Sequence, residues 1–252
     1  MKCGYIRDTW DCGETMEIEE KHTGRYGARG QKRQEKKKAT PEDIEKRNQW
    51  KKERDLRRLI KWNFSPGDYW YTLTFRKDER PEWEEMMKIM ADFIRKLRRE
   101  YKKRGWELKY IYPPQIGERG AVHIHFLVNA ESSDKDNRTD KMIVGLWKYG
   151  KAYPEIVYEV NDGKLANYIA TPKKEWEPEK AKDYHPSRNL IRKDPKRKEV
   201  KRRSLVDKQG QLIYPAVPKG YYIDKDSVRM GINPITGYAY RHYTLVKIDR
   251  RI

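Results

Sequence analysis

The chain has 252 residues, a length that suits one sizeable domain with extensions or one domain plus a smaller one. Its 58 Lys and Arg residues outnumber 39 Asp and Glu residues, and the net charge of +19 favours a polyanionic partner, nucleic acid before an anionic membrane. No apolar run approaches the roughly 20 residues that span a bilayer, and no signal-peptide stretch opens the chain. We therefore expect a cytoplasmic protein with no membrane partner.

The N-terminal quarter of the chain is strongly basic. Residues 22–38 combine glycines with a dense positive run and offer little for a core, so we expect an extended arm there. A helix is expected from Thr40 to about Trp62, because Thr can cap a helix and Pro41 suits its first position. We expect residues 1–65 to form a basic N-terminal arm and helix.

Alternating strand and helix patterns between residues 66 and 178 predict an α+β core. Residues 69–75 are aromatic and β-branched, which is typical of a central strand. An amphipathic helix should begin after Pro81 and end at Gly105. The remaining expected elements are two antiparallel strands at about 107–113 and 121–129, a helix at 140–149, a strand at 151–160 and a helix at 163–170.

The C-terminal part is expected to form a basic linker, followed by a segment that packs on the core, over residues 179–252. Eight of the twelve residues from Arg192 to Arg203 are Lys or Arg, which leaves a solvated linker and a phosphate-tracking arm as equal interpretations. Strand-like pieces follow at 211–214 and 242–248. The DNA-binding residues expected in the basic segments of the chain are Arg25, Arg29, Lys32, Arg33, Arg188, Arg197, Arg202 and Arg203.

A pair of histidines, His123 and His125, lies in the apolar strand expected at 121–129. Because side chains alternate along a strand, both imidazoles project from one face. Unliganded, the two rings would each need a hydrogen-bond partner and would repel when protonated, whereas a divalent cation satisfies both nitrogens. An isolated pair of this kind is more often structural, but the preceding strand that ends at Gln115 and the basic chain favour a metal site.

The chain resembles the HUH endonucleases, and among them the rolling-circle replication initiator (Rep) proteins of phages, plasmids and integrative elements. Tyr71-Thr-Leu-Thr-Phe75 is similar to the first motif of that family, and His123-Ile-His125 to its metal-binding second motif. Leu165-Ala-Asn-Tyr168-Ile is similar to the helix that bears the nucleophilic tyrosine. The resemblance implies a central antiparallel sheet of four to five strands with flanking helices, Tyr168 as nucleophile, and Mn²⁺ or Mg²⁺ held by His123, His125 and Gln115.

The sequence departs from the family pattern at the third metal ligand. Relatives carry a glutamate at the end of the strand before the histidines, where this chain has Gln115. A glutamine can ligate through its amide oxygen, and Glu118 is the alternative third ligand.

A second departure concerns the lysine that relatives carry one helical turn after the tyrosine. This chain has Thr171 and Pro172 at those positions, and the nearest lysines are Lys173 and Lys174. Both lysines are therefore candidates for that catalytic role.

The function implied is nicking of single-stranded or hairpin origin DNA, which leaves a 5′-phosphotyrosine and a free 3′-hydroxyl. A host helicase and polymerase are implied partners, because the chain lacks a phosphate-binding loop motif of its own. Two alternatives stay open: a relaxase or single-tyrosine transposase of the same superfamily, and a non-catalytic nucleic-acid-binding protein with a structural histidine pair. Among other tyrosines, we expect Tyr158 to be the rival nucleophile and Tyr153 to be less able to reach the metal.

Overall fold

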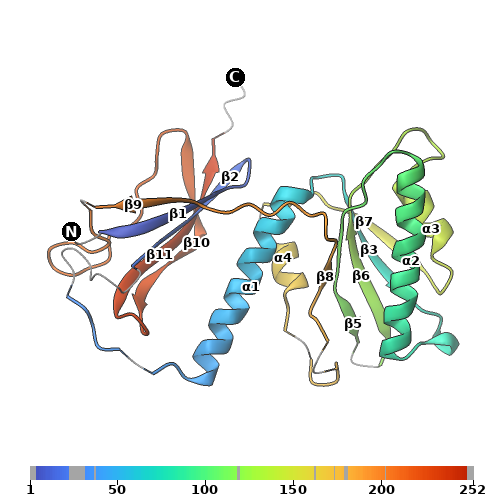
Figure 1. Cartoon of the computed structure of the whole chain (residues 1–252), viewed down its shortest axis with the longest axis horizontal. Coiled ribbons are helices and arrows are strands. Elements are labelled where there is room, and N and C mark those ends of the chain that lie inside the picture. Colours follow the sequence, from blue (N-terminus) through green and yellow to red (C-terminus); the bar gives the residue numbers. More distant parts are fainter. Residues whose placement is uncertain are drawn as a thin grey trace. The chain divides into compact units, whose positions relative to one another are not determined.

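A computed structural model describes residues 4–22, 32–36, 38–117, 120–161, 163–172, 174–178, 181–201 and 203–248 of the chain. Helices and antiparallel strands make it an α+β protein, as expected (Figure 1). The chain forms two compact units, one of Met1–Asn48 with Arg192–Ile252 and one of Gln49–Ile191. This division differs from the expected one, because strands from both ends of the chain share a sheet. Across the described residues, no helix is long and apolar enough to cross a membrane.

The unit of residues 49–191 is built on an antiparallel sheet in which the strand order is β7-β3-β6-β4-β8, and β5 also pairs with β6. Alternating aromatic and β-branched residues form the central strand β3, and β6 carries the histidine pair. The strands are β3 (Tyr69–Thr74), β4 (Tyr110–Tyr112), β5 (Pro114–Ile116), β6 (Val122–Val128), β7 (Ala152–Ile156) and β8 (His185–Pro186).

Helices cover both faces of this sheet, and Figure 1 shows α2 and α4 on opposite sides of it. Because side chains alternate along β6, Phe126 belongs to a core with α2 and α3, and Leu127 to a second core with α1 and α4. Gly105, with φ of +73°, follows α2 and ends it as expected. The helices are α1 (Pro41–Asn63), the short 3₁₀ helix η1 (Lys77–Glu79), α2 (Trp83–Lys103), α3 (Thr139–Leu146) and α4 (Lys164–Ile169).

The other unit is a second antiparallel sheet with the strand order β10-β11-β2-β1-β9. Its C-terminal strand β11 was expected in part, at 242–248. The basic run from Arg192 to Arg203 is not wholly a linker or arm, because residues 196–200 pair with the first strand of the chain. The strands are β1 (Tyr5–Asp11), β2 (Thr15–Lys21), β9 (Lys196–Val200), β10 (Tyr221–Asn233) and β11 (Tyr238–Lys247).

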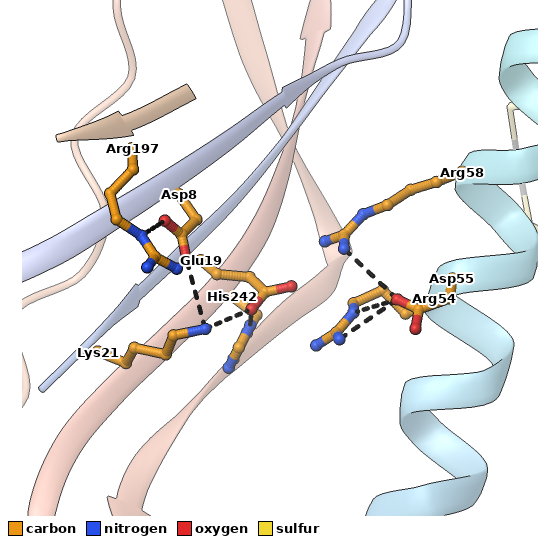
Figure 2. Close-up of polar contacts among 8 residues, drawn as sticks. All are labelled: Asp8, Glu19, Lys21, Arg54, Asp55, Arg58, Arg197 and His242. Atoms are coloured by element: carbon orange, nitrogen blue, oxygen red, sulfur yellow. Dashed lines mark hydrogen bonds and ion pairs between the residues drawn. The ribbon is translucent and has the colours of Figure 1, made fainter. Parts of the chain in front are cut away.

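A buried carboxylate explains why a basic segment forms the edge strand β9. Arg197 donates two hydrogen bonds to Asp8, at 2.7 and 2.8 Å, and Lys21 lies 3.4 Å from the same carboxylate (Figure 2). Burial raises the pKa of Asp8, but hydrogen bonds from Arg197 and the charge of Lys21 outweigh it and lower the pKa overall. The Asp8 carboxylate is therefore charged at neutral pH and joins β9 to β1.

Part of the expected N-terminal arm is held against the turn between β10 and β11. The backbone N–H of Gln34 donates to the carbonyl of Gly237 at 3.0 Å, and Arg33 Nε donates to the carbonyl of Thr236 at 3.0 Å. Gly237 permits this approach, because a Cβ there would lie 2.3 Å from the carbonyl oxygen of Gln34. Residues 32–36 are thus not a free arm, and residues 23–31 lie outside the described part of the chain.

Candidate active site

The strand register brings the three expected metal ligands to one face of the sheet. Gln115 of β5 lies directly opposite His123 of β6, and Thr72 of β3 lies directly opposite His125. Directly opposed residues in an antiparallel pair project to the same face. The two imidazole rings lie edge to face, with centroids 5.0 Å apart. The expectation that one face carries both histidines is confirmed.

The ring of His125 is enclosed on all sides. It is 8% exposed and stacks on Trp70, with centroids 5.1 Å apart and planes 9° apart. Burial, followed by the charge of His123, lowers the pKa of His125 to about 4, so the ring is neutral at pH 7. Its Nδ1 lies 3.2 Å from Thr72 Oγ1, and its Nε2 lies 2.8 Å from the hydroxyl of Tyr168. If the proton is on Nδ1, Thr72 accepts it and the Nε2 lone pair faces Tyr168.

His123 borders an open cleft. Its Nδ1 lies 3.2 Å from the carbonyl oxygen of Ala121, and donation there leaves Nε2 as a lone-pair donor. The cleft, of about 60 Å³, is also lined by Gln115 and Lys174. Within the described ranges, no group of three His, Cys, Asp or Glu side chains is placed to hold a metal, so the third donor on this face is the Gln115 amide. Glu118 lies outside the described residues.

The short helix α4 brings Tyr168 to the histidine face. Gly163, with φ of +77°, precedes the helix, and Ala166 and Ile169 bury its inner side. The Tyr168 ring meets His125 edge to face, with centroids 5.2 Å apart, and is 45% exposed. Burial and then the charge of Glu155 raise the pKa of Tyr168, so the hydroxyl keeps its proton at neutral pH.

The segment after α4 is fastened to β5. Glu177 accepts hydrogen bonds from the backbone N–H of Ile116 at 3.1 Å and of Lys174 at 3.2 Å. The indole N–H of Trp176 donates to the carbonyl of Ile116 at 2.8 Å. These contacts hold Lys174 at the cleft that His123 lines, while Lys173, the other expected lysine, lies outside the described residues.

The two rival tyrosines are placed in the reverse of the expected order. Tyr153 lies on β7 opposite Thr72, which is itself opposite His125, so Tyr153 belongs to the histidine face and is 50% exposed. Tyr158 lies beyond the end of β7 and is 80% exposed. Sequence reasoning erred here because the pairing register of β7 is not visible in the sequence.

Other residues around the site were not anticipated. Period-two alternation already places Trp70 and Thr72 on one face of β3, but their position beside His125 depends on the register with β6. Glu155 follows from the same register, because it lies opposite Trp70. No local signal marked Glu177, whose role depends on a contact 61 residues away in the chain.

The expected DNA-binding residues are scattered over both units. Lys32, Arg188 and Arg203 are exposed, Arg33 contacts the β10–β11 turn, and Arg197 pairs with Asp8. DNA contact stays a prediction for all of them. Those outside the described residues are Arg25, Arg29 and Arg202.

Comparison with protein families gives one match, over residues 68–174, to a family described as replication-associated protein ORF2. The matched segment contains β3, Gln115, the histidine pair and Tyr168. No curated protein and no solved structure matches the chain significantly.

Proposed function

Because residues 68–174 belong to the replication-associated protein ORF2 family, a rolling-circle replication initiator family of HUH type, we propose that this protein nicks single-stranded origin DNA with Tyr168 as the nucleophile. The nick would start rolling-circle replication. A host polymerase would extend the free 3′-hydroxyl, and a host helicase would unwind the duplex ahead of it.

The observation that carries this proposal is the 2.8 Å contact between the Tyr168 hydroxyl and His125 Nε2, on the face that also bears His123 and Gln115. A structural tyrosine would need only one hydrogen-bond partner. It would not require a second imidazole 5.0 Å from the first, or an amide opposite that imidazole. The cluster is better explained by phosphodiester chemistry than by packing alone.

The donor set fits a divalent cation. His125 is neutral because its pKa is lowered, His123 has an Nε2 available for ligation, and Gln115 supplies an amide oxygen. Such a set suits Mn²⁺ better than Mg²⁺, which prefers oxygen ligands. When bound, the cation would polarise the oxygens of the scissile phosphate and stabilise the negative charge that develops on them.

Tyr168 would form the new bond. Its hydroxyl oxygen attacks the phosphorus, the bond from phosphorus to the 3′ oxygen breaks, and that oxygen leaves with the electron pair and takes up a proton. One phosphate ester replaces another, so rejoining the strand requires no ATP. At its reference pKa of about 10, only about one phenol in a thousand is ionised at pH 7.

His125 would orient the hydroxyl of Tyr168 and would not retain its proton. The pKa of His125 is about 4 and that of Tyr168 is raised above 10, and this gap of about six units makes full transfer cost about 8 kcal/mol. Lys174, at the cleft that His123 also lines, would supply a positive charge for the phosphate.

A covalent adduct tests the proposal. Labelled single strands tiled across the DNA around the protein's own gene are incubated with the full chain and Mn²⁺, and adducts are resolved under denaturing conditions. We expect one strand to become attached, and peptide mapping to locate it on Tyr168. Strand binding without any adduct would support a non-catalytic nucleic-acid-binding protein instead.

A further inference from the structure

A second hollow, of about 640 Å³, lies in the unit of residues 49–191, between the end of α2, the loop that leads to β4 and the residues after β8. None of its lining residues lines the cleft beside His123. Trp106 and Tyr110 line it, and both pack on the core that contains α2. The hollow therefore belongs to the α2 side of the sheet, whereas His125 stacks on Trp70 of the other core.

Three cations converge on this hollow. Arg98 and Lys102 lie one turn apart on α2, and Arg188 lines the hollow from the chain after β8. All three are exposed, and within the described part of the chain none of them pairs with a carboxylate. Arg98 instead donates to the hydroxyl of Tyr110 at 3.4 Å. Glu107 is the single acidic residue in the lining, so the hollow is net positive.

The position of Arg188 is built into the fold. The backbone N–H of Ser187 donates to the carbonyl of Tyr110 at 2.8 Å, and the N–H of Tyr110 donates to Ser187 Oγ at 3.2 Å. On the other side, the Asn189 amide donates to the carbonyl of Leu108 at 3.0 Å. Like charges held together without partners repel one another, and a bound anion relieves that repulsion.

Two half-buried aromatic rings beside these cations are themselves held in place. Tyr110 stacks on Tyr112, with centroids 6.0 Å apart, and Tyr112 stacks on His185 at 4.8 Å. Trp106 packs edge-on against Tyr101 at 5.7 Å. Cations that can hold phosphates beside fixed aromatic faces are the chemistry of single-strand binding, in which each stacked base contributes about 1 to 3 kcal/mol.

We propose that this hollow is a second binding site for single-stranded DNA, in which Arg98, Lys102 and Arg188 hold phosphates and the two aromatic rings receive bases. The proposal rests on the proposed function, since it takes the origin strand as the ligand. Trp83 lines the cleft of His123 at the start of α2, and Arg98 follows fifteen residues later, ~22 Å along the helix axis. The hollow would thus bind nucleotides that lie beyond those at the cut.

The test compares two triple variants of the full chain with the same loss of charge. R98A/K102A/R188A removes the cations of the hollow, and K88A/K135A/K148A removes three exposed lysines elsewhere in the same unit. Affinity for a long labelled single strand is measured by fluorescence anisotropy over a series of salt concentrations. We expect the slope of log affinity against log salt to fall by about 2 in the first variant, because each single-strand phosphate contact contributes about 0.7. The control should change it by less than half as much.

Equal slopes in the two triple variants, or a wild-type slope in the first, would overturn the second site. The single variants R98A and R188A, each expected to lower the slope by about 0.7, keep the test decisive if the triple variant unfolds. A short strand that spans only the cut should form adduct equally well with wild type and with R98A/K102A/R188A. If wild type forms no adduct at all, the proposed function fails, and the salt slopes still decide whether the hollow binds DNA.

Discussion

The hydroxyl oxygen of Tyr168 lies 2.8 Å from Nε2 of His125, although 43 residues separate them in the chain. The contact joins the proposed nucleophile to a proposed metal ligand through the nitrogen that a cation would need. Metal binding and this hydrogen bond therefore compete for one lone pair. A cation that wins the competition frees the hydroxyl to turn toward a phosphate.

Replacing Tyr168 with Phe should abolish the covalent adduct and leave the fold intact. The loss of one half-exposed hydrogen bond should cost about 0.5 to 1.5 kcal/mol of stability. Because the competing hydroxyl is gone, Mn²⁺ affinity measured by calorimetry should equal or exceed that of wild type, by up to about fivefold. Tyr153→Phe is the matched control, since Tyr153 is half exposed on the same face, and it should keep the adduct. An adduct with Tyr168→Phe that is lost with Tyr153→Phe would move the nucleophile to β7.

Removing either imidazole should abolish Mn²⁺-dependent nicking and leave single-strand binding largely unchanged. His123→Ala and His125→Ala each delete a nitrogen donor, so we expect Mn²⁺ affinity to fall by at least about tenfold. DNA affinity should persist, because phosphate contacts by basic residues dominate it. Titrations of Mn²⁺ and of a labelled strand measure the two properties separately, and full nicking by either variant would remove the metal-site proposal.

Gln115 and Glu118 can be distinguished by their amide and acid exchanges. If Gln115 is the third ligand, Gln115→Glu should tighten Mn²⁺ binding, because a carboxylate adds a negative charge to the site. Glu118→Gln should then leave the affinity unchanged. The opposite pattern, with a marked loss in Glu118→Gln, would assign the third ligand to Glu118.

The metal-free protein should lose stability as the pH falls from about 6.5 to 4. The folded state holds the pKa of His125 at about 4, below the unfolded value near 6.5, so only the unfolded chain takes up the proton in that range. The stability from the neutral ring is complete above pH 6.5, and about 3 kcal/mol of it is lost by pH 4. Urea unfolding at pH 7 and pH 4.5 in the presence of a chelator measures the loss.

The matched control for this pH dependence is His22→Gln, because the pKa of His22 is also lowered to about 4, in the other unit. His125→Gln should flatten the pH dependence of the unit of residues 49–191, and His22→Gln should leave that unit unaffected. An unchanged pH dependence in His125→Gln would show that another group titrates.

Arg197→Ala should destabilise the five-stranded sheet, by about 1 to 3 kcal/mol, because it deprives the buried Asp8 carboxylate of two hydrogen bonds. Lys21 remains beside Asp8 and limits the loss. Arg203→Ala, an exposed cation from the same basic run, is the control and should change stability by less than about 0.5 kcal/mol. Equal stability of the two variants by urea unfolding would mean that the Asp8 pair contributes nothing to the fold.

Local periodicity determined much of this protein in advance. The capping residues before Pro41 and the apolar spacing after Pro81 predicted α1 and α2, and both helices are present. Alternation along β6 was enough to place His123 and His125 on one face. These features depend on neighbours within a few residues, which the sequence displays directly.

The tertiary structure decided everything that depends on which strands pair and in which register. Only the register set Gln115 opposite His123 and brought Tyr153, not Tyr158, to the histidine face. Likewise, Asp8 and Arg197 meet across 189 residues, so a run that resembles a solvated linker became a strand. Pairings of this kind are selected by the burial and charge balance of whole sheets, and no short window of sequence contains that free energy.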